Sequence, residues 1–254
     1  MSMLPFLKRR FINRINSSES DGLIITGDIS NGMMLESHLR YLATHYDRPI
    51  YFVLGNHDYY WRHRDSVESD VRRLCRLHDN LHWLSDEDEP VSLKSGIALV
   101  GDEGWYDVAV GGHGMSKWCI DRLINLDYLP LASYDQQVEV WKERAHRSTK
   151  KLISKINDAL DNHDVVYVAT HFPPWVEASR SNWQLSREYW LSYNTNFVLG
   201  QEIENLMKNR SGEIVVLSGH THLACEVSVN KKIICKVAPA SYWGRIGPEE
   251  LIFL

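Results

Sequence analysis

Five short apolar runs, each closed by a side chain that can bind a metal ion, constrain this chain more than any other feature of its sequence. They occupy residues 23–28, 50–56, 97–102, 165–171 and 214–220. Continuous apolar runs of this length are typical of strands that are buried on both faces. Between them, apolar residues recur at helical spacing, for example at Leu35, Leu39 and Leu42. The alternation of strand and helix predicts a layered α/β fold.

The C-terminal part of the chain has a different pattern. Residues 225–239 divide into two β-type runs around Asn230-Lys231-Lys232, which predicts an antiparallel hairpin, and we expect residues 250–254 to form a last short strand. The sequence contains no internal repeat, low-complexity tract or linker-like stretch. We therefore expect one domain over residues 1–254.

The charge balance and the cysteines argue against several classes of protein. Of 254 residues, 28 are Lys or Arg and 33 are Asp or Glu, so the net charge of −5 offers no basic excess for nucleic acid. No apolar stretch approaches the roughly 20 residues that cross a bilayer, and the first residues lack the apolar core of a signal peptide. Four cysteines without C-x-x-C spacing make a zinc knot or a disulfide framework poor interpretations. We expect a cytoplasmic protein with reduced thiols and no membrane partner, and the sequence leaves its oligomeric state open.

The apolar runs end in side chains that can bind a divalent metal ion: Asp28, Asn56, Asp102, His171 and His220. In open α/β sheets, ligands bind beyond the carboxyl ends of the strands, so these side chains should converge. Glycines beside several of them let the backbone turn tightly at the strand end. The sequence therefore predicts a polar site at one edge of the fold.

Four short motifs surround these positions: Gly27-Asp28, residues 55–58 (Gly-Asn-His-Asp), His171 before Phe-Pro-Pro, and residues 219–222 (Gly-His-Thr-His). Taken singly, Gly-Asp is often only a turn, Asn-His-Asp can form a capping turn, and His171 can be a core histidine. Their joint occurrence in this order, each closing an apolar run, favours a metal site. Carboxylate, amide and imidazole ligands without a thiolate suit Mn, Fe or Zn.

These motifs resemble those of the calcineurin-like metallophosphoesterase family, whose pattern is DxH, GDxx, GNH[DE], a lone H, and GHxH. Four of the five blocks match in order over about residues 20–225. The resemblance implies a four-layer α-β-β-α sandwich with two metal ions at the strand ends. By position, Asp28 would bridge both metals, and His222 would bind the second. Three further side chains would complete the first site: Asn56, His171 and His220.

The resemblance also implies a chemistry. His57 would be the catalytic histidine beside the scissile phosphate, oriented by Asp58. Two divalent ions about 3.5–4 Å apart can clamp a phosphate and supply a hydroxide, and a histidine that is not a ligand can protonate the leaving oxygen. We therefore predict metal-dependent hydrolysis of a phosphate mono- or diester by attack of a metal-bound hydroxide, with a small molecule as the expected substrate. A catalytically impaired binding or scaffold module of the same fold is the alternative.

The first block of the family pattern, DxH, is absent. Apolar residues from Leu4 to Ile15 already have helical spacing and no strand precedes them, so we expect the fold to lack its first strand. Residues 161–163 spell Asp-Asn-His, but they lie between a helix and the start of a strand, at the wrong end of the sheet. We therefore reject them as the missing block.

The missing block leaves one of the two metal sites incomplete. The metal that shares Asp28 and His222 would keep only those two protein ligands, too few for a stable site. Asp102 is a conceivable substitute, but a turn or cap role is expected for it. Either the chain is an N-terminally truncated enzyme or it is a natural degenerate, and the retained His57 favours the first interpretation.

Two stretches, residues 103–134 and 172–199, are longer than a connection needs and are rich in aromatic residues. Such loops tend to be lids or binding walls, so we expect them on the substrate side. Their aromatic side chains would either stack on a planar leaving group or, more simply, fill the core. If the second stretch forms a lid, Arg180 or Arg187 would hold a distal phosphate.

Overall fold

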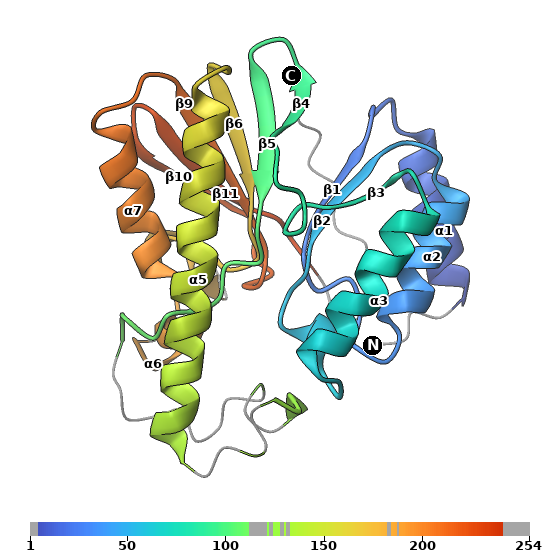
Figure 1. The fold of residues 1–254 in the computed structure, drawn as a ribbon, viewed down its shortest axis with the longest axis horizontal. Helices are drawn as coiled ribbons and strands as arrows, with labels where there is room; N and C mark the ends of the chain where they lie inside the picture. The colour runs from blue at the N-terminus through green and yellow to red at the C-terminus, as the bar shows by residue number, and fades with distance from the viewer. Residues whose placement is uncertain are drawn as a thin grey trace.

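Two helix layers enclose two β-sheets (Figure 1). Helices α5 (Tyr134–Leu160) and α7 (Phe197–Met207) cover the outer face of one sheet, and α1 (Pro5–Ser17), α2 (Leu35–His45) and α3 (Arg64–Leu77) cover that of the other. The computed structural model describes residues 5–111, 121, 124–127, 130, 133–181, 184–186 and 188–240. This α-β-β-α order confirms the predicted fold class.

The larger sheet has six strands in the order β10-β11-β9-β6-β5-β4. Its four inner strands are parallel: β5 (Ile97–Gly101), β6 (Val165–Ala169), β9 (Glu213–Ser218) and β11 (Ile233–Val237). The outer strands β4 (Val91–Lys94) and β10 (Cys225–Asn230) are antiparallel to their neighbours. The predicted hairpin is therefore confirmed as β10–β11, whereas the strand expected at residues 250–254 lies outside the described residues.

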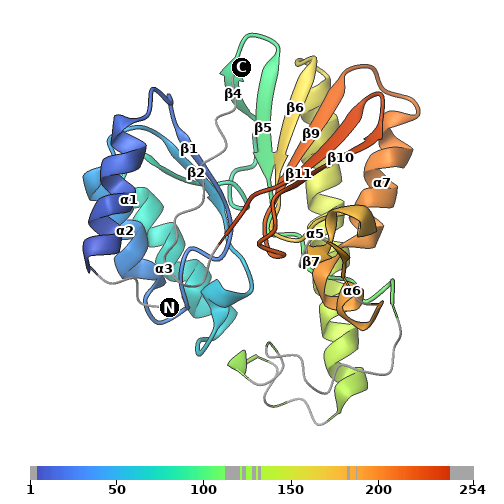
Figure 2. The same ribbon diagram turned by 180° about the vertical axis from the view of Figure 1, so that it is seen from behind.

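The smaller sheet contains three parallel strands, β1 (Leu23–Thr26), β2 (Ile50–Val53) and β3 (Leu81–Trp83). In the described part of the chain, β1 is an edge strand that pairs with β2, and it follows α1. Figure 2 shows the molecule from behind, with the two sheets side by side and β1 on the side that faces the larger sheet. The carboxyl ends of β1, β2, β6 and β9 are thereby brought to the same edge of the sandwich.

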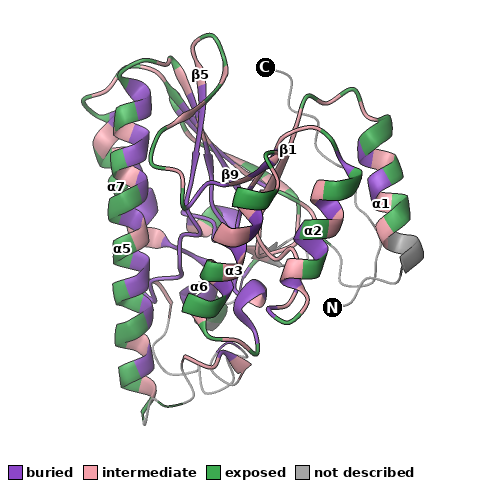
Figure 3. Ribbon diagram, turned by 45° about the vertical axis from the view of Figure 1, so that its right-hand side comes forward, coloured by how far each residue is buried: buried purple, intermediate pink, exposed green. Residues whose placement is uncertain are grey.

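The helices owe their positions to apolar stripes at helical spacing, which Figure 3 shows as buried faces turned toward the sheets. On α5, Trp141, Leu152 and Ile156 are fully buried, and Ser133 and Gln136 form a capping box at its start. The helices predicted between the apolar runs, including the one with Leu35, Leu39 and Leu42, are confirmed. Within the described residues, no helix is long and apolar enough to span a membrane.

Several described aromatic residues of the two long stretches fill the core. Trp105, Tyr106 and Phe172 are fully buried and pack together with ring centroids 5.2–5.4 Å apart. Tyr106 also meets Trp141 edge-on at 5.3 Å, which joins the first stretch to α5. Core filling, rather than a stacking wall, is the role that these contacts give them.

Short elements complete the second long stretch. They are the 3₁₀ helix η3 (Val176–Ala178), the strands β7 (Arg180–Ser181) and β8 (Gln184–Leu185), and α6 (Glu188–Asn194). Arg180 donates through Nε to the carbonyl of Glu177 at 3.0 Å, so this hydrogen bond is made within its own loop. Arg187, the other residue predicted to hold a phosphate, lies outside the described residues.

Candidate metal centre

Four strand ends deliver the predicted ligands to one place. Asp28 follows β1, Asn56 follows β2, His171 follows β6, and His220 follows β9. Ligand atoms of Asp28, His171 and His220 all lie within 4.8 Å of one another. Residues separated by up to 192 positions in the chain (28 to 220) thus share one small volume.

His171 lies at the centre of this group. Its Nε2 is 3.0 Å from Asn56 Oδ1, 3.3 Å from His220 Nδ1 and 3.4 Å from Asp28 Oδ1. His171 is 1% exposed and Asn56 is 4% exposed, so water has little access to these contacts. The structure therefore brings together four of the five predicted metal ligands.

The outer hydrogen bonds of this group decide which atoms carry protons. His171 Nδ1 is 2.7 Å from the carbonyl of Thr26, and His220 Nε2 is 3.1 Å from Asn194 Oδ1. A carbonyl oxygen only accepts, so each of these outer nitrogens is protonated and donates. In the neutral imidazoles the inner nitrogens, His171 Nε2 and His220 Nδ1, then present lone pairs.

Hydrogen bonds from its amide nitrogen likewise orient Asn56 so that its side-chain oxygen faces the other ligands. Its Nδ2 donates to Tyr60 Oη at 2.9 Å and to Asp121 Oδ1 at 2.8 Å. Asn56 Oδ1 and Asp28 Oδ1 are therefore acceptors that face the acceptor nitrogens of the two histidines. When both imidazoles are neutral, as metal binding requires, four lone pairs converge at this point, and a divalent cation is the partner that such a donor set fits.

The electrostatics favour the ionisation states that metal binding requires. Burial by itself would raise the pKa of Asp28, but the charges of His171, His57 and His220 and the backbone N–H of His57 together hold that pKa below its usual value. Burial, and then the charge of His171, lower the pKa of His220 well below its usual value. A carboxylate and a neutral imidazole are the forms that bind metal ions.

The loops at this edge have an unusual backbone. Three of the predicted ligands, Asp28, His220 and His222, have φ angles of 55°, 63° and 62°, in the left-handed region that non-glycine residues rarely adopt. Such conformations persist only where the surrounding structure enforces them, and they cluster at functional sites. The local strain agrees with a functional role for these strand ends.

Gly27 has no room for a side chain. Its φ is 93°, and an added Cβ would lie 2.5 Å from His171 Nδ1 and 2.8 Å from the nitrogen of Gly55. We therefore expect Gly27→Ala to displace the His171 ring, to weaken metal binding at least about tenfold, and to destabilise the fold by about 1–3 kcal/mol. Titration calorimetry with Zn²⁺ and thermal unfolding measure the two effects.

Gly96→Ala is the matched control for this substitution. Gly96 also has a positive φ, 76°, but the nearest atom to an added Cβ is Asp164 Oδ2 at 3.4 Å. The Gly96→Ala protein should therefore be destabilised only by backbone strain at the positive φ, and its metal affinity should stay unchanged. Equal loss of metal affinity in both variants would contradict the steric explanation.

The two residues predicted to be catalytic have different surroundings. The His57 side chain is 29% exposed, its Nε2 lies 3.9 Å from Asp28 Oδ2, and its ring stacks on Tyr60 with centroids 4.5 Å apart. The Asp58 side chain, by contrast, is fully buried. His57 is thus placed beside the ligand cluster with one face open to solvent.

Asp58 holds two loops together through the backbone. Its Oδ2 accepts from the N–H groups of Gly55 at 2.9 Å and Ile29 at 3.2 Å, and its Oδ1 accepts from Ser30 at 2.7 Å. Burial, followed by the charge of Asp28, raises its pKa, and these three hydrogen bonds oppose that rise. These carboxylate contacts connect the loops after β1 and β2, whereas the sequence had suggested that Asp58 orients His57.

The remaining predicted positions have separate environments. His222 lies outside the group of three close ligands, and burial lowers its pKa while the charge of Asp28 opposes this effect. Asp102 is 5% exposed and accepts from Ser148 Oγ on α5, so it contacts a helix rather than the ligands. Asp161 pairs with Arg210 at 2.6 Å near the C-terminal end of α5, before β6, as expected for a motif at the other end of the sheet.

Sequence reasoning missed the residues that orient the ligands. Asp121, 4% exposed, accepts from both Asn56 and Tyr60, and Asn194 accepts from His220. Both lie within the two long stretches that were expected on the substrate side, but neither belongs to a recognisable motif. Only the unusual length of these stretches pointed toward them.

Comparison with known proteins assigns the chain to a family. The model for calcineurin-like phosphoesterases matches residues 6–224. The chain therefore belongs to the calcineurin-like phosphoesterase family, a family of metal-dependent phosphoesterases, as its motifs suggested. No curated protein sequence matched.

Solved structures with the same fold are distant in sequence. A dimetal phosphatase from Danio rerio superposes with a TM-score of 0.53 at 15% identity, over 91% of this chain and 76% of its own. The TT1561 protein of Thermus thermophilus gives a TM-score of 0.50 at 11% identity, over 92% of this chain and 83% of its own. At these identities the likeness concerns the fold.

Proposed function

We propose that this chain is a metal-dependent hydrolase of a small-molecule phosphate ester. The observation that carries the proposal is the convergence of acceptor atoms at the ligand cluster. Asn56 Oδ1, His220 Nδ1 and Asp28 Oδ1 all lie within 3.4 Å of His171 Nε2. When the imidazoles are neutral, these lone pairs repel one another unless a cation lies among them, and this favours a bound divalent ion.

Each ligand has a defined role in this proposal. Asp28, Asn56, His171 and His220 would hold one divalent ion, Mn, Fe or Zn, with Asp28 also reaching a second ion near His222. Bound ions of this kind polarise a phosphoryl oxygen and supply a hydroxide at neutral pH. Thr26, Asn194 and Asp121 keep the lone pairs of the ligands turned inward through their hydrogen bonds.

His57 is the proposed proton donor to the leaving oxygen. Its side chain is partly exposed beside Asp28, and its backbone N–H, which donates to Asp28 Oδ1 at 3.0 Å, ties its position to that of the ligand. Stacking on Tyr60 restricts the ring further. Such a histidine reaches a substrate oxygen without binding metal itself.

The substrate, the site of action and the domain limits stay predictions. A phosphate mono- or diester of a small molecule, a cytoplasmic location, and one domain over residues 1–254 are the working expectations. Purified full-length protein with Mn²⁺ and two chromogenic substrates, a phosphate monoester and a phosphodiester, tests both the activity and the ester class. Absence of turnover with both, despite bound metal, would favour a binding module of the same fold.

Loss of metal is the result expected for His220→Ala. Since His220 Nδ1 is one of four convergent acceptors, its removal should weaken Zn²⁺ or Mn²⁺ binding by at least about 100-fold, more than is usual for second-sphere changes. Titration calorimetry and elemental analysis of the dialysed protein measure this. His146→Ala, an exposed histidine on α5, is the control. Unchanged metal content in His220→Ala would remove the basis of the proposed centre.

A further inference from the structure

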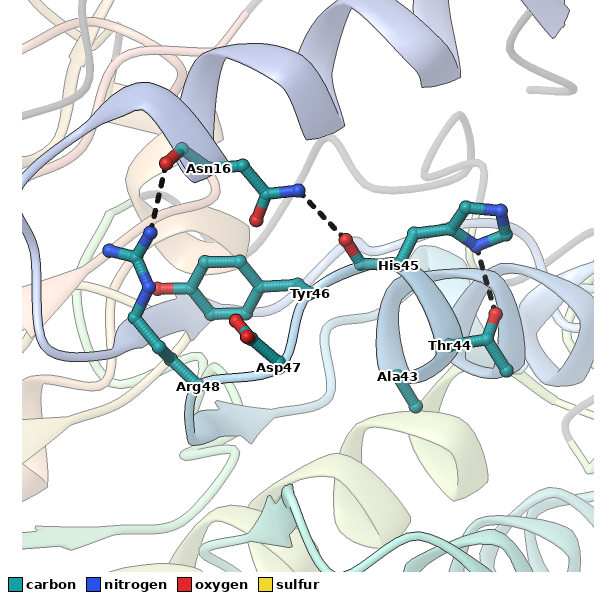
Figure 4. A pocket seen from close by; sticks show the side chains of 7 residues that line it. All are labelled: Asn16, Ala43, Thr44, His45, Tyr46, Asp47 and Arg48. Carbon is teal, nitrogen blue, oxygen red and sulfur yellow. Dashed lines mark hydrogen bonds between the residues drawn. The ribbon is translucent and has the colours of Figure 1, made fainter.

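Two pockets lie outside the ligand cluster. The larger, about 390 Å³, lies where α1 and α2 end, before β2 begins (Figure 4). Its Arg48 donates to the carbonyls of Asn16, Ser18 and Ser20. The guanidinium thus connects the loop before β2 to the end of α1 and the residues that follow it. This arrangement stabilises the loop before β2 and indicates no ligand.

The smaller pocket has a different character. It measures about 120 Å³ and lies between α3 and α5, beyond the ends of β3 and β5. None of the proposed metal ligands lines it. The volume holds several water molecules, which is room for a tetrahedral oxyanion or the terminal phosphoryl group of a larger molecule.

Positive charge predominates in this pocket, which we call the α3–α5 pocket. Five cationic side chains line it against three carboxyl groups. One of these carboxyl groups, that of Glu68, is already paired with Arg64 and with Arg72. A second, Asp102, accepts from Ser148 Oγ. These two carboxyl groups are thus bound to side chains of the pocket wall. The excess of positive formal charge in the pocket favours an anion as the ligand.

The third carboxyl group belongs to Glu103 and is buried. Glu103 is 4% exposed and accepts from Trp83 Nε1 at 3.2 Å. Like the other two carboxyl groups, it is held by a side chain that lines the pocket.

One face of α5 supplies three of the cations. Arg144, Arg147 and Lys151 are spaced by three and four residues, which places them on the same side of the helix. Arg144 is buried and stacks with its guanidinium carbon 3.3 Å from the ring centroid of Trp105. Arg147 and Lys151 are exposed, so the row of cations runs from the pocket floor to its mouth.

Two buried donors in the pocket wall have no acceptor. Ser85 and Trp105 line the pocket, where Ser85 is 5% exposed and Trp105 is fully buried. Neither Ser85 Oγ nor Trp105 Nε1 has a hydrogen-bond partner among the described residues. Buried donors without partners are rare in folded proteins. Their presence in a cationic pocket points to an acceptor that comes from outside the chain.

We propose that the α3–α5 pocket binds a phosphate-class oxyanion, with Ser85 Oγ and Trp105 Nε1 as neutral donors and Arg144, Arg147 and Lys151 as cationic ones. Charge-assisted hydrogen bonds from a row of cations favour tetrahedral oxyanions over neutral ligands. The assignment is independent of the proposed hydrolysis, because it uses none of the metal ligands.

The pocket also lies directly behind the metal centre. The carbonyl of Glu103 accepts the backbone N–H of His171 at 2.9 Å, and Thr170 Oγ1 donates to the same carbonyl at 3.2 Å. An oxyanion in the α3–α5 pocket therefore lies next to the segment that positions a metal ligand.

Nuclear magnetic resonance of the tryptophan indole groups tests the proposal on the full-length, Zn²⁺-loaded chain. Titration with inorganic phosphate should produce a saturable shift of the Trp105 Nε1–H resonance. The double variant Arg147→Gln/Lys151→Gln, which changes only exposed side chains, should weaken this binding about tenfold. Lys150→Gln changes an exposed lysine of α5 that does not line the pocket. It is the matched control and should bind within about twofold of the unmodified chain.

Two further variants distinguish phosphate binding in the α3–α5 pocket from phosphate binding at the metal centre. Ser85→Ala should weaken phosphate binding without unfolding the protein, because the hydroxyl that it removes has no partner among the described residues. His220→Ala should leave the titration unchanged, since no metal ligand lines the pocket. A Trp105 shift that vanishes in His220→Ala, or that persists undiminished in the double variant, would overturn the assignment, as would the absence of a saturable shift.

A comparison of ligands identifies the source of the oxyanion. Equal affinity for inorganic phosphate and glycerol 3-phosphate would assign the pocket to a terminal phosphoryl group. Binding of inorganic phosphate alone would assign it to the free ion. Either result supports an oxyanion site, whereas equal binding of a neutral polyol such as glycerol would contradict it.

Discussion

In the His57→Ala protein, turnover is expected to fall about 10²–10⁴-fold while the bound metal stays unchanged, the range typical for loss of a general acid. His57 Nε2 lies 3.9 Å from Asp28 Oδ2, near the ligands but outside their mutual contacts. Removing its ring therefore leaves all four convergent acceptors in place. Steady-state kinetics and elemental analysis of the same sample measure the two quantities together.

The leaving group distinguishes proton donation from a structural effect. A nitrophenolate leaves readily without a proton, whereas an alkoxide does not, so the loss in His57→Ala should be larger for an alkyl phosphate ester than for a nitrophenyl ester. An equal loss with both esters would instead indicate that His57 binds substrate or shapes the site. A drop in metal content would show that His57 belongs with the ligands.

The predictable part of the fold is the part in which local sequence and burial agree. The runs that became β2, β5, β6 and β9 are largely apolar because sheet neighbours and helices cover most of their residues. The run that became β1 is half-buried throughout, since β1 is an edge strand of the described chain. By contrast, β3 contains three residues, and β4 alternates between intermediate and exposed positions. Neither has a continuous apolar run, so neither was predicted from the sequence.

The residues of the candidate site also fall into a predictable group and an unpredictable one. Asp28, Asn56, His171 and His220 were predictable because each directly follows an apolar run, and parallel strands bring such positions together. Asp121 and Asn194 were not, because they reach the site from long stretches whose course no periodicity describes. Their positions depend on tertiary packing, and no local sequence pattern indicates which Asp or Asn side chain will reach the site.

Asp58 makes contacts that its motif did not predict, and its orienting role stays a prediction. The GNH[DE] block placed it next to the catalytic histidine, so an orienting role was expected. Its carboxylate instead accepts three backbone N–H groups, from Gly55, Ile29 and Ser30. Two of these donors directly follow the metal ligand Asp28 and the third directly precedes Asn56, so Asp58 supports the ligands through the backbone.

Asp58→Ala is therefore expected to be strongly destabilising. Each buried N–H that loses its acceptor costs about 1–3 kcal/mol, and partial repair by water brings the expected total to about 3–5 kcal/mol. For a domain of this size, that corresponds to a fall of about 10 °C or more in Tm. Chemical and thermal unfolding of the metal-free protein measure the effect without interference from metal affinity.

Comparison with His57→Ala separates the two roles of the motif. If Asp58 acted by orienting His57, Asp58→Ala would reduce turnover while stability and metal affinity stayed near normal. If Asp58 instead holds the two loops together, turnover, stability and metal affinity should all fall in Asp58→Ala, because the backbone beside Asp28 and Asn56 loses its shared acceptor. Asp79→Ala, an exposed carboxylate after α3, controls for loss of charge and should change stability by less than about 0.5 kcal/mol.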